Sequence, residues 1–381
     1  MMATRDKEII LWHEFDGPGD TSIGVLEDIC RMYSERNGIR VVPEVMGIQE
    51  LGRRIGEVAG TNLAPHVAFV PADMASYYVQ GQYSQVPSDF SEGLLDNEAL
   101  ATMQVRGLQY GLPALLGNHL VLYYNKEIYG EAPQSWEQVA AMLPELQAKQ
   151  IIPVGADLEQ SYWFIPFLTA FGGWPMKDGR PDLIHDAMKQ ALQFVHTQLE
   201  EGHIVSLNGS RDLLEHFISG QVGAIICGEW NFNYLTQHMQ GKLGIGRLPS
   251  IGGNDSIPMS SSIGMIFPNR ALESELKDEL RSFARFMLSE ECQLKWVNEV
   301  QRIPANRAVL QYLAANSSPN WVEILSLLQE SRPMPIDPLM IHNWVAMEHG
   351  LRVLLEEKDT DAALRKIEST LNEALLEVGE Q

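Results

Sequence analysis

Four tryptophans of this 381-residue chain stand beside polar side chains in short segments with turn-forming residues. They are Trp12, Trp163, Trp230 and Trp344. A flat aromatic ring packs on the apolar C–H face of a sugar, and neighbouring polar groups bond with the sugar hydroxyls. This combination indicates a carbohydrate-binding site. The same tryptophans could instead fill hydrophobic cores or a seam between domains.

Motifs of catalysis and of cofactor binding are not found in the sequence. The glycines of Gly241–Gly246 lack the Lys-Ser/Thr ending of a phosphate-binding loop, and Ser210 lacks the glycine that follows an esterase nucleophile. The ten histidines are scattered without metal-ligand spacing. We therefore expect no enzyme, no cofactor and no metal. A glycosidase remains a less favoured alternative, because its two carboxylates could come from distant residues.

The charge of the chain is strongly acidic. Its 28 Lys and Arg against 50 Asp and Glu give a formal net charge of −22. Nucleic-acid binders need a basic face that displaces counterions, and anionic membrane surfaces attract basic segments. The charge therefore argues against both kinds of partner.

The cysteines and the N-terminal residues give information on the cellular compartment of the protein. Cys30, Cys227 and Cys292 are odd in number, and the first two lie in apolar runs, so we expect buried free thiols. No run of about 18 apolar residues predicts a membrane-spanning helix. The polar residues at the start lack the apolar core of a signal peptide. The protein is either cytoplasmic or exported with a signal that is not part of this sequence.

The elements that must position these side chains follow a strand–helix alternation. Strands are expected at 9–15, 39–45 and 67–70, with amphipathic helices between them. This order predicts a mainly parallel sheet, which binds ligands beyond the carboxyl ends of its strands. His13, Glu14 and Asp16 come at the end of the first strand, and Asp73 follows the third.

Later segments indicate a second domain. Two extended runs between 110 and 126 are broken at Gly117-Asn118, and the extended run 261–267 could return to the first domain. Helices are expected at 136–147, 162–170, 185–199 and 213–218, and strands at 222–226 and 243–248. One long apolar helix face runs from 272 to 287, and 364–375 forms a terminal amphipathic helix.

The order of several short segments carries a family resemblance over about 300 residues. These segments are Leu11-Trp12-His13, 112–126, 133–137, 170–173, 217–224, Cys227-Gly228-Glu229-Trp230 and 303–306. With them the chain resembles the extracellular solute-binding proteins of ABC transporters (family 1), in the sugar-binding branch that includes maltose-binding protein.

The resemblance implies a two-lobed α/β fold of the periplasmic-binding-protein type (type II-like). Each lobe would hold a mainly parallel sheet flanked by helices, and the lobes would close over the ligand about hinge crossings. The first lobe would comprise 1–116 and 268–315, and the second 119–263 and 320–381. Hinges would lie near 117–118, 264–267 and 316–319.

The resemblance also implies ligand contacts. The ligand-binding positions it assigns are Trp230, Trp344, Tyr162, Trp163, Asp73, Asn118, His13, Glu14 and Asp16. Arg302 could read a ligand carboxylate or phosphate, or it could form a surface ion pair. Val70 and His66 depart from the residues of the maltose-binding branch, so maltose itself is not the expected ligand.

These features predict a substrate-binding component of an ABC importer, which captures a carbohydrate, such as an oligosaccharide, and delivers it to the permease subunits. An alternative on the same fold is the binding of an anionic solute such as a glycerophosphodiester. We expect a monomer in the bacterial periplasm or lipid-anchored at the cell surface, with an export signal outside this sequence.

Overall fold

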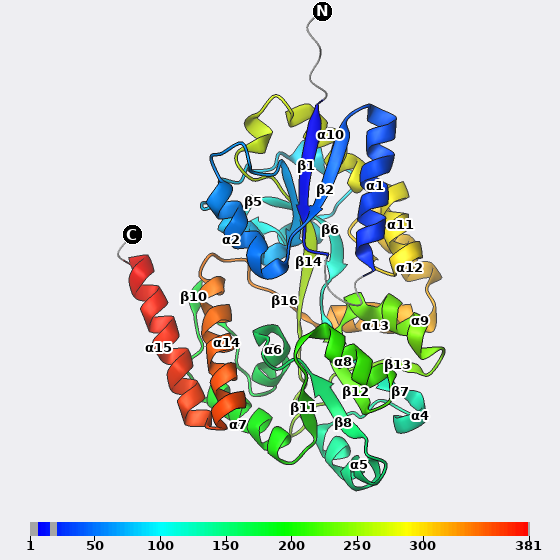
Figure 1. Ribbon diagram of the computed structural model, residues 1–381, viewed down its shortest axis with the longest axis vertical. Coiled ribbons are helices and arrows are strands. Elements are labelled where there is room, and N and C mark those ends of the chain that lie inside the picture. Colours follow the sequence, from blue (N-terminus) through cyan, green and yellow to red (C-terminus); the bar gives the residue numbers. More distant parts are fainter. Residues whose placement is uncertain (1–6, 16–20, 380–381) are drawn as a thin grey trace, which may run out of the picture. The chain divides into compact units, whose positions relative to one another are not determined.

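The computed structural model describes residues 7–15 and 21–379 and divides the chain into two compact units (Figure 1). Unit 1 comprises Met1–Asn118, Ser261–Ser317 and Ile336–Pro338. Unit 2 comprises His119–Ser260, Ser318–Pro335 and Leu339–Gln381. The chain therefore passes between the units after residues 118, 260, 317, 335 and 338. The sequence placed the second crossing at 264–267, a few residues later than this boundary.

Unit 1 is built on a mixed sheet with the strand order β15–β6–β14–β3–β1–β2. Its strands are β1 (Glu8–His13), β2 (Arg40–Val45), β3 (Val67–Pro71), β6 (Gly111–Gly117), β14 (Met259–Ile266) and β15 (Ile303–Pro304). β1 pairs in parallel with β2 and β3, whereas β14 runs antiparallel to β3 and β6. The predicted α/β class is confirmed. The expected mainly parallel sheet is wrong, because β14 returns from unit 2 against the direction of its neighbours.

The helices of unit 1 cover this sheet. They are α1 (Ser22–Asn37), α2 (Ile48–Val58), α3 (Asn97–Ala101), α10 (Lys277–Met287), α11 (Glu290–Val300) and α12 (Arg307–Asn316), with the 3-10 turns η1 (Ala72–Tyr77), η2 (Ser88–Phe90) and η4 (Ala271–Glu273). A small hairpin joins β4 (Gln104–Val105) to β5 (Leu108–Gln109). The apolar face expected from 272 to 287 is divided between η4 and α10, because Ser274 is extended.

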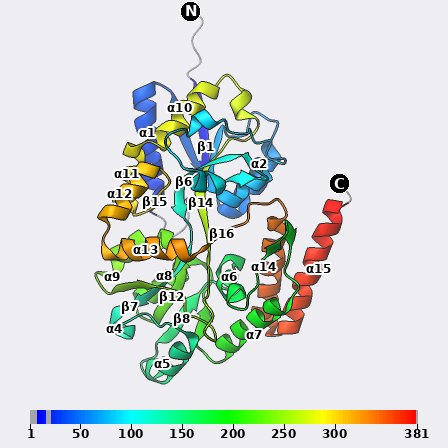
Figure 2. The same cartoon turned by 180° about the vertical axis from the view of Figure 1, so that it is seen from behind.

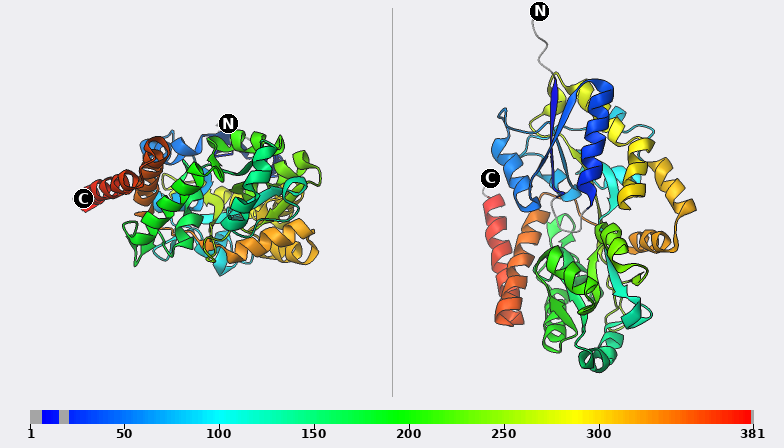
Figure 3. Two further views of the ribbon diagram at one scale, coloured as in Figure 1. Left: turned by 90° about the horizontal axis from the view of Figure 1, so that it is seen from below. Right: turned by 45° about the vertical axis from the view of Figure 1, so that its right-hand side comes forward.

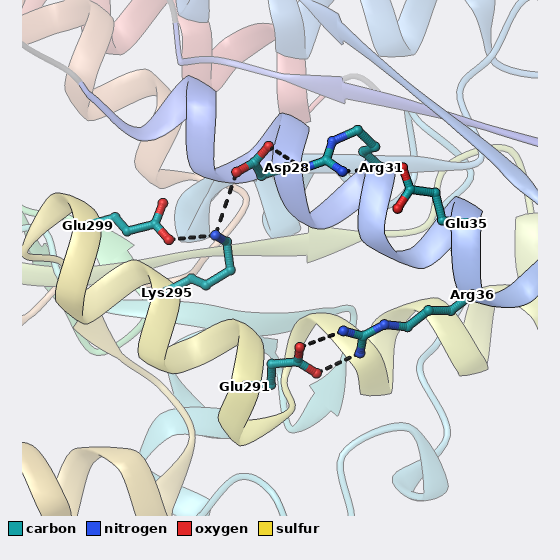
Figure 4. Close-up of polar contacts among 7 residues, drawn as sticks. All are labelled: Asp28, Arg31, Glu35, Arg36, Glu291, Lys295 and Glu299. Carbon is teal, nitrogen blue, oxygen red and sulfur yellow. Dashed lines mark hydrogen bonds and ion pairs between the residues drawn. The ribbon is translucent and has the colours of Figure 1, made fainter.

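The helices α1 and α11 pack against one another over a shared core that includes Leu26, Cys30 and Trp296. Ion pairs lie at the rim of this contact (Figure 4). Arg36 donates two hydrogen bonds of 2.6 Å to the Glu291 carboxylate, and Lys295 pairs with Asp28 at 3.6 Å and with Glu299. The side chains of these pairs are partly exposed, so burial of the core contributes most of the stability of the contact.

Unit 2 holds a second mixed sheet with the order β11–β8–β12–β7–β13. Its strands are β7 (Leu120–Asn125), β8 (Ile152–Ala156), β11 (Ile204–Ser206), β12 (Val222–Gly228) and β13 (Leu243–Gly246). β8 lies parallel to β11 and β12, whereas β7 is antiparallel to β12 and β13. Every residue of β7 and β12 is buried, so these two strands form the centre of the unit. The short β16 (Arg332–Pro333) pairs with Met259 and Ser260 at the start of β14.

Ten helical segments surround the sheet of unit 2 in the described part of the chain. They are α4 (Lys126–Tyr129), α5 (Trp136–Ala148), α6 (Ser161–Ala170), α7 (Asp186–Glu200), α8 (Gly209–Ile218), η3 (Glu229–Asn231), α9 (Phe232–Met239), α13 (Pro319–Glu330), α14 (Met340–Glu357) and α15 (Thr360–Gly379). A hairpin of β9 (Met176–Lys177) and β10 (Arg180–Pro181) follows α6. Seen from behind, α14 and α15 lie side by side with α7 next to them (Figure 2).

The α14–α15 pair is close because one glycine permits it. A Cβ on Gly350 of α14 would lie 2.3 Å from the Ile367 side chain of α15, nearer than real carbon contacts. The same Cβ would lie 3.0 Å from the Ala363 carbonyl oxygen, and both Ala363 and Ile367 are buried. The two helices remain adjacent in both further views (Figure 3). The terminal amphipathic helix predicted from the sequence is therefore confirmed, and it packs mainly on α14 and α7.

Candidate functional site

The candidate ligand residues divide between the two units. Tyr162, Trp163, Trp230 and Trp344 belong to unit 2, and His13, Glu14, Asp73, Asn118 and Arg302 belong to unit 1. Asp16 lies outside the described residues.

Trp230 follows the central strand of unit 2. β12 ends at Gly228, and the chain turns into η3, which carries Trp230 at the carboxyl end of the strand. The side chain is half-buried, whereas its neighbours Glu229 and Asn231 are buried. Asn231 donates its amide to the Cys227 Sγ at 3.1 Å, which ties the turn back to the strand. The sequence expectation that Trp230 follows a strand at a turn is confirmed.

Tyr162, Trp163 and Trp344 lie next to Trp230 in unit 2. The ring centroids of Trp163 and Trp230 are 6.0 Å apart and nearly perpendicular, at 87°. Tyr162 stands 6.3 Å from Trp163 and 6.1 Å from Trp344. Trp344, Tyr162, Trp163 and Trp230 thus form one connected series of rings, which we call the aromatic row. All four side chains are half-buried, so each presents part of its surface.

Three elements assemble the aromatic row. The α6 helix supplies Tyr162 and Trp163, the turn after β12 supplies Trp230, and α14 supplies Trp344. Next to Trp344, the buried Asn343 donates its amide to the Pro175 carbonyl at 2.8 Å, which fixes the first turns of α14. Residues about 180 positions apart in the sequence are therefore neighbours in unit 2.

The two inner rings have their polar atoms bonded to backbone. The Trp163 Nε1 donates to the Ile226 carbonyl at 2.8 Å, and the Tyr162 hydroxyl donates to the Met259 carbonyl at 3.1 Å. These bonds fix the orientation of both side chains. The inner rings of the row therefore offer mainly aromatic surface to a ligand.

Asp157 is a residue near this site that the sequence reasoning missed. It directly follows β8, a parallel neighbour of β12, and is 6% exposed. One carboxylate oxygen, Oδ2, accepts from the Gly209 N–H at 3.2 Å, whereas Oδ1 has no hydrogen-bond partner among the described residues. Burial raises the pKa of the Asp157 carboxyl to about 6. The available signal was an apolar run that ends in an aspartate, but Pro153 and Gly155 obscured the strand.

In unit 1, the candidate residues follow neighbouring strands. His13 ends β1 and pairs in parallel register with Phe69 of β3, so Glu14 and Asp73 follow strands at the same edge of the sheet. His13 is buried with its ring 5.9 Å from that of Phe15, whereas Glu14 and Asp73 are half-buried. This arrangement agrees with the expectation that strand ends bring these residues to one edge.

Asn118 and Arg302 complete the unit 1 set. Asn118 follows β6 with a left-handed φ of 46°, a conformation that asparagine tolerates better than most residues. Arg302 is 1% exposed, and its Nη1 donates to the Ser22 hydroxyl at 3.1 Å, at the start of α1. The alternative of a surface ion pair for Arg302 is therefore wrong, because the side chain is enclosed rather than at the surface.

The three cysteines are free and buried, as the sequence predicts. Burial raises the pKa of the Cys30 and Cys227 thiols to about 12 and that of Cys292 to about 11, so all three remain protonated at neutral pH. Within residues 7–15 and 21–379, no helix is long and apolar enough to cross a membrane. The same part of the chain contains no group of His, Cys, Asp or Glu side chains arranged to hold a metal ion.

Comparison with known proteins connects these features to a family. Residues 28–323 match the family described as bacterial extracellular solute-binding protein. The chain is 20% identical over 330 residues to the maltooligosaccharide ABC transporter solute-binding lipoprotein of Streptococcus pneumoniae R6, covering 81% of this chain and 76% of that protein. It is also 20% identical over 344 residues to the maltodextrin-binding protein MdxE of Bacillus subtilis 168, covering 85% and 80% respectively. Since the family match spans most of the sequence, the chain belongs to the bacterial extracellular solute-binding proteins.

Proposed function

We propose that this protein is the substrate-binding component of an ABC importer that captures an oligosaccharide and delivers it to the permease subunits. The observation that carries the proposal is the aromatic row of unit 2, in which four half-buried rings follow one another at 6.0–6.3 Å. The names of the relatives, which refer to maltooligosaccharide and maltodextrin, support an oligosaccharide as the ligand class.

The chemistry of the row suits a sugar chain. Aromatic faces pack on the C–H faces of sugar rings, and that contact needs no hydrogen bond from the aromatic side chain. The polar atoms of Tyr162 and Trp163 are bonded to backbone carbonyls, so stacking is what these two residues can contribute. Four consecutive rings extend beyond the width of one sugar ring. A ligand with several sugar units would therefore contact more rings of the aromatic row than a monosaccharide would.

The polar residues of unit 1 are proposed to contact the hydroxyls of the same class of ligand. Glu14 and Asp73 follow strands at one sheet edge, where a carboxylate can accept hydrogen bonds from hydroxyl groups. His13, Asn118 and Asp16, the last of which lies outside the described residues, are proposed as ligand contacts in the same way. As a member of an extracellular family, the protein would act outside the cytoplasmic membrane, in the periplasm or anchored at the cell surface.

A thermal-shift panel tests the ligand class. The panel contains glucose, maltose, longer α-1,4- and β-1,4-linked oligosaccharides, polyols, amino acids and glycerophosphodiesters. A ligand that binds only the folded state adds about 2.7 kcal/mol of stability at a hundredfold excess over its Kd. We expect oligosaccharides to raise the melting temperature more than glucose does. A shift produced only by the anionic solutes would overturn the sugar proposal.

A comparison of three variants and an analysis of the bound sugar serve as controls for this test. Trp344→Ala and Trp230→Ala remove the outer rings of the row, and Tyr312→Ala removes an aromatic ring that is 58% exposed on α12 of unit 1. Only the first two variants should show a clearly smaller sugar-induced shift than wild type at the same sugar concentration. Prolonged incubation of the wild-type protein with the bound oligosaccharide, followed by product analysis, should return the ligand intact. Shortened products would favour a glycosidase instead.

A further inference from the structure

The last residue of β12 is a glycine, and the indole of Trp230 lies directly against it. A Cβ built on Gly228 would be 2.2 Å from the Trp230 Cη2 and Cζ3 atoms and 2.3 Å from its Cε2. Real Cβ atoms essentially never come that close to another heavy atom. One face of the indole therefore occupies the space that any other side chain at position 228 would need.

The backbone at position 228 does not itself require glycine. Gly228 has φ −74° and ψ 150°, an extended conformation that every L-residue adopts readily. Its hydrogen bonds also do not depend on the side chain, since Gly228 offers its carbonyl to the Tyr123 hydroxyl at 3.3 Å. The close approach of the Trp230 ring is thus the feature of the structure that excludes a Cβ here.

A second contact fixes the same indole from its side. The Trp163 ring meets Trp230 at an interplanar angle of 87°, and the Trp163 Nε1 is held by the Ile226 carbonyl of β12. Both contacts that hold Trp230 therefore depend on the strand β12. The Ile226 carbonyl holds the Trp163 ring, and Gly228, which has no side chain, leaves space for the Trp230 indole. Because β12 is buried along its whole length, it is a rigid base for the ring.

We propose that Gly228 and Trp163 are positioning residues that hold the Trp230 indole in its binding orientation, with one face on Gly228 and the opposite face left for the ligand. The identity of the ligand in this inference rests on the proposed function. The orientation of the Trp230 ring does not depend on that function. An alanine at position 228 would turn the indole away from β12 while leaving the strand intact. The indole would then either block the place where a sugar would stack or no longer present its face there.

The orientation can be measured without any ligand. Two indoles this close produce an exciton couplet in the circular dichroism spectrum. The Trp163→Phe variant removes one of the two indoles, so the signal that disappears in this variant identifies the couplet of the pair. We expect Gly228→Ala to lose the same couplet, although both indoles are still present. Gly155→Ala, in the neighbouring strand β8, serves as the matched control, because its Cβ would meet only side-chain methyl groups at 3.1–3.5 Å. This control should retain the couplet.

A double-mutant cycle separates positioning from a general effect on folding. Gly228→Ala alone should weaken oligosaccharide binding at least tenfold in calorimetric titration. In the Trp230→Ala background, the same glycine substitution should change neither the remaining affinity nor the melting temperature, because its clash partner is gone. A couplet that survives in Gly228→Ala, or a loss of stability equal in both backgrounds, would overturn the inference. If the wild-type protein binds no sugar, the proposed function fails, while the spectra of ligand-free protein still decide the role of Gly228.

Discussion

Trp230 is the residue whose removal should separate binding from folding. Burying about 60 Å² of sugar face on the indole, at roughly 25 cal/mol per Å², contributes about 1.5 kcal/mol, or about tenfold in Kd. We therefore expect Trp230→Ala to weaken oligosaccharide binding at least tenfold in calorimetric titration. The melting temperature of the ligand-free protein should change little, because the ring is only half-buried. A fully packed core tryptophan would instead cost roughly 3 to 5 kcal/mol of stability, and that outcome with unchanged affinity would contradict the proposal.

Asp157 makes the stability of the protein fall as the pH rises. Its pKa in the folded protein is about 6, above the ordinary value of 3.8, because burial disfavours the charged carboxylate. Below about pH 4 the carboxyl is protonated in both states, and between pH 4 and 6 only the unfolded chain ionises. The resulting loss is on the order of 3 kcal/mol and persists above pH 6.

The variant Asp157→Asn should therefore raise the free energy of unfolding at pH 7.5 and change it little at pH 4. The amide oxygen can still accept the hydrogen bond from Gly209. Urea denaturation at the two pH values measures both effects. Asp89→Asn is the opposite control, since the Arg281 guanidinium lowers the pKa of that exposed carboxyl and its ionised form is favoured in the folded state. An Asp157→Asn variant that is less stable at pH 7.5 would contradict the assignment.

The identity of the ring residues could be predicted from sequence, but their detailed roles could not. Tyr162, Trp163, Trp230 and Trp344 stand beside turns and polar neighbours, which marks them as candidates for ligand contact. Which polar atom of each ring is bonded to backbone depends on distant carbonyls, such as those of Ile226 and Met259. No local pattern contains that information. Their role in ligand binding stays a prediction.

At the scale of the elements, the periodicity of apolar residues predicted the positions of helices and regular strands better than the pairing of strands in the sheets. α7 and α15 lie where one-face apolar patterns placed them, within one to four residues at each end, and α6 begins one residue before the aromatic-rich segment 162–170 that predicted it. β8 was missed, because Pro153 and Gly155 interrupt its apolar run. Strand direction was also missed, because a sequence does not state that β14 will enter a sheet between β3 and β6.

At the α1–α11 contact, the core and the rim should respond differently to mutation. Arg36→Gln breaks an exposed ion pair with Glu291, and we expect a loss below about 1 kcal/mol that disappears at about 1 M salt. Trp296→Ala empties a fully buried site and should cost roughly 3 to 5 kcal/mol at any salt concentration. Urea denaturation at low and high salt compares them. An equal loss from both variants would show that the ion pair, rather than the core, holds these helices.

At the scale of the whole molecule, the family implies a response to ligand that scattering can measure. Solute-binding proteins of this family are expected to close on their ligand, so the radius of gyration should fall when a binding oligosaccharide is added. At a sugar concentration near the wild-type Kd, Trp230→Ala should show a several-fold smaller fall than wild type, because it binds at least tenfold more weakly. An unchanged radius for wild-type protein saturated with sugar would contradict the expected closure.

Of the chain crossings between the two units, those marked by a break in an extended run are easier to predict from sequence than those within a loop. The crossing near Gly117-Asn118 was visible as a break between two extended runs, and the chain does leave unit 1 after Asn118. The crossings after residues 335 and 338 lie in a short proline-containing stretch without a periodic pattern, and nothing in the sequence distinguishes them from an ordinary loop.

A truncated chain tests how strongly unit 1 depends on its late segments. A fragment ending at residue 258 lacks β14, which lies between β3 and β6 in the sheet, and β15 at its edge. We expect this fragment to show no cooperative thermal transition for unit 1, because β3 and β6 lose their shared partner and the sheet loses the helices α10, α11 and α12. A fragment that melts as sharply as the intact chain would show that β14 is dispensable.

The position of β14 has a consequence for the order of events during synthesis. Between the end of β6 and the start of β14 the ribosome must add 259 minus 117, or 142, residues. At about 5–20 residues per second, this delay is on the order of ten seconds. During that time the nascent chain holds strands of a sheet whose middle member does not yet exist. Such late completion means that the sheet of unit 1 cannot form until most of the chain has been synthesised.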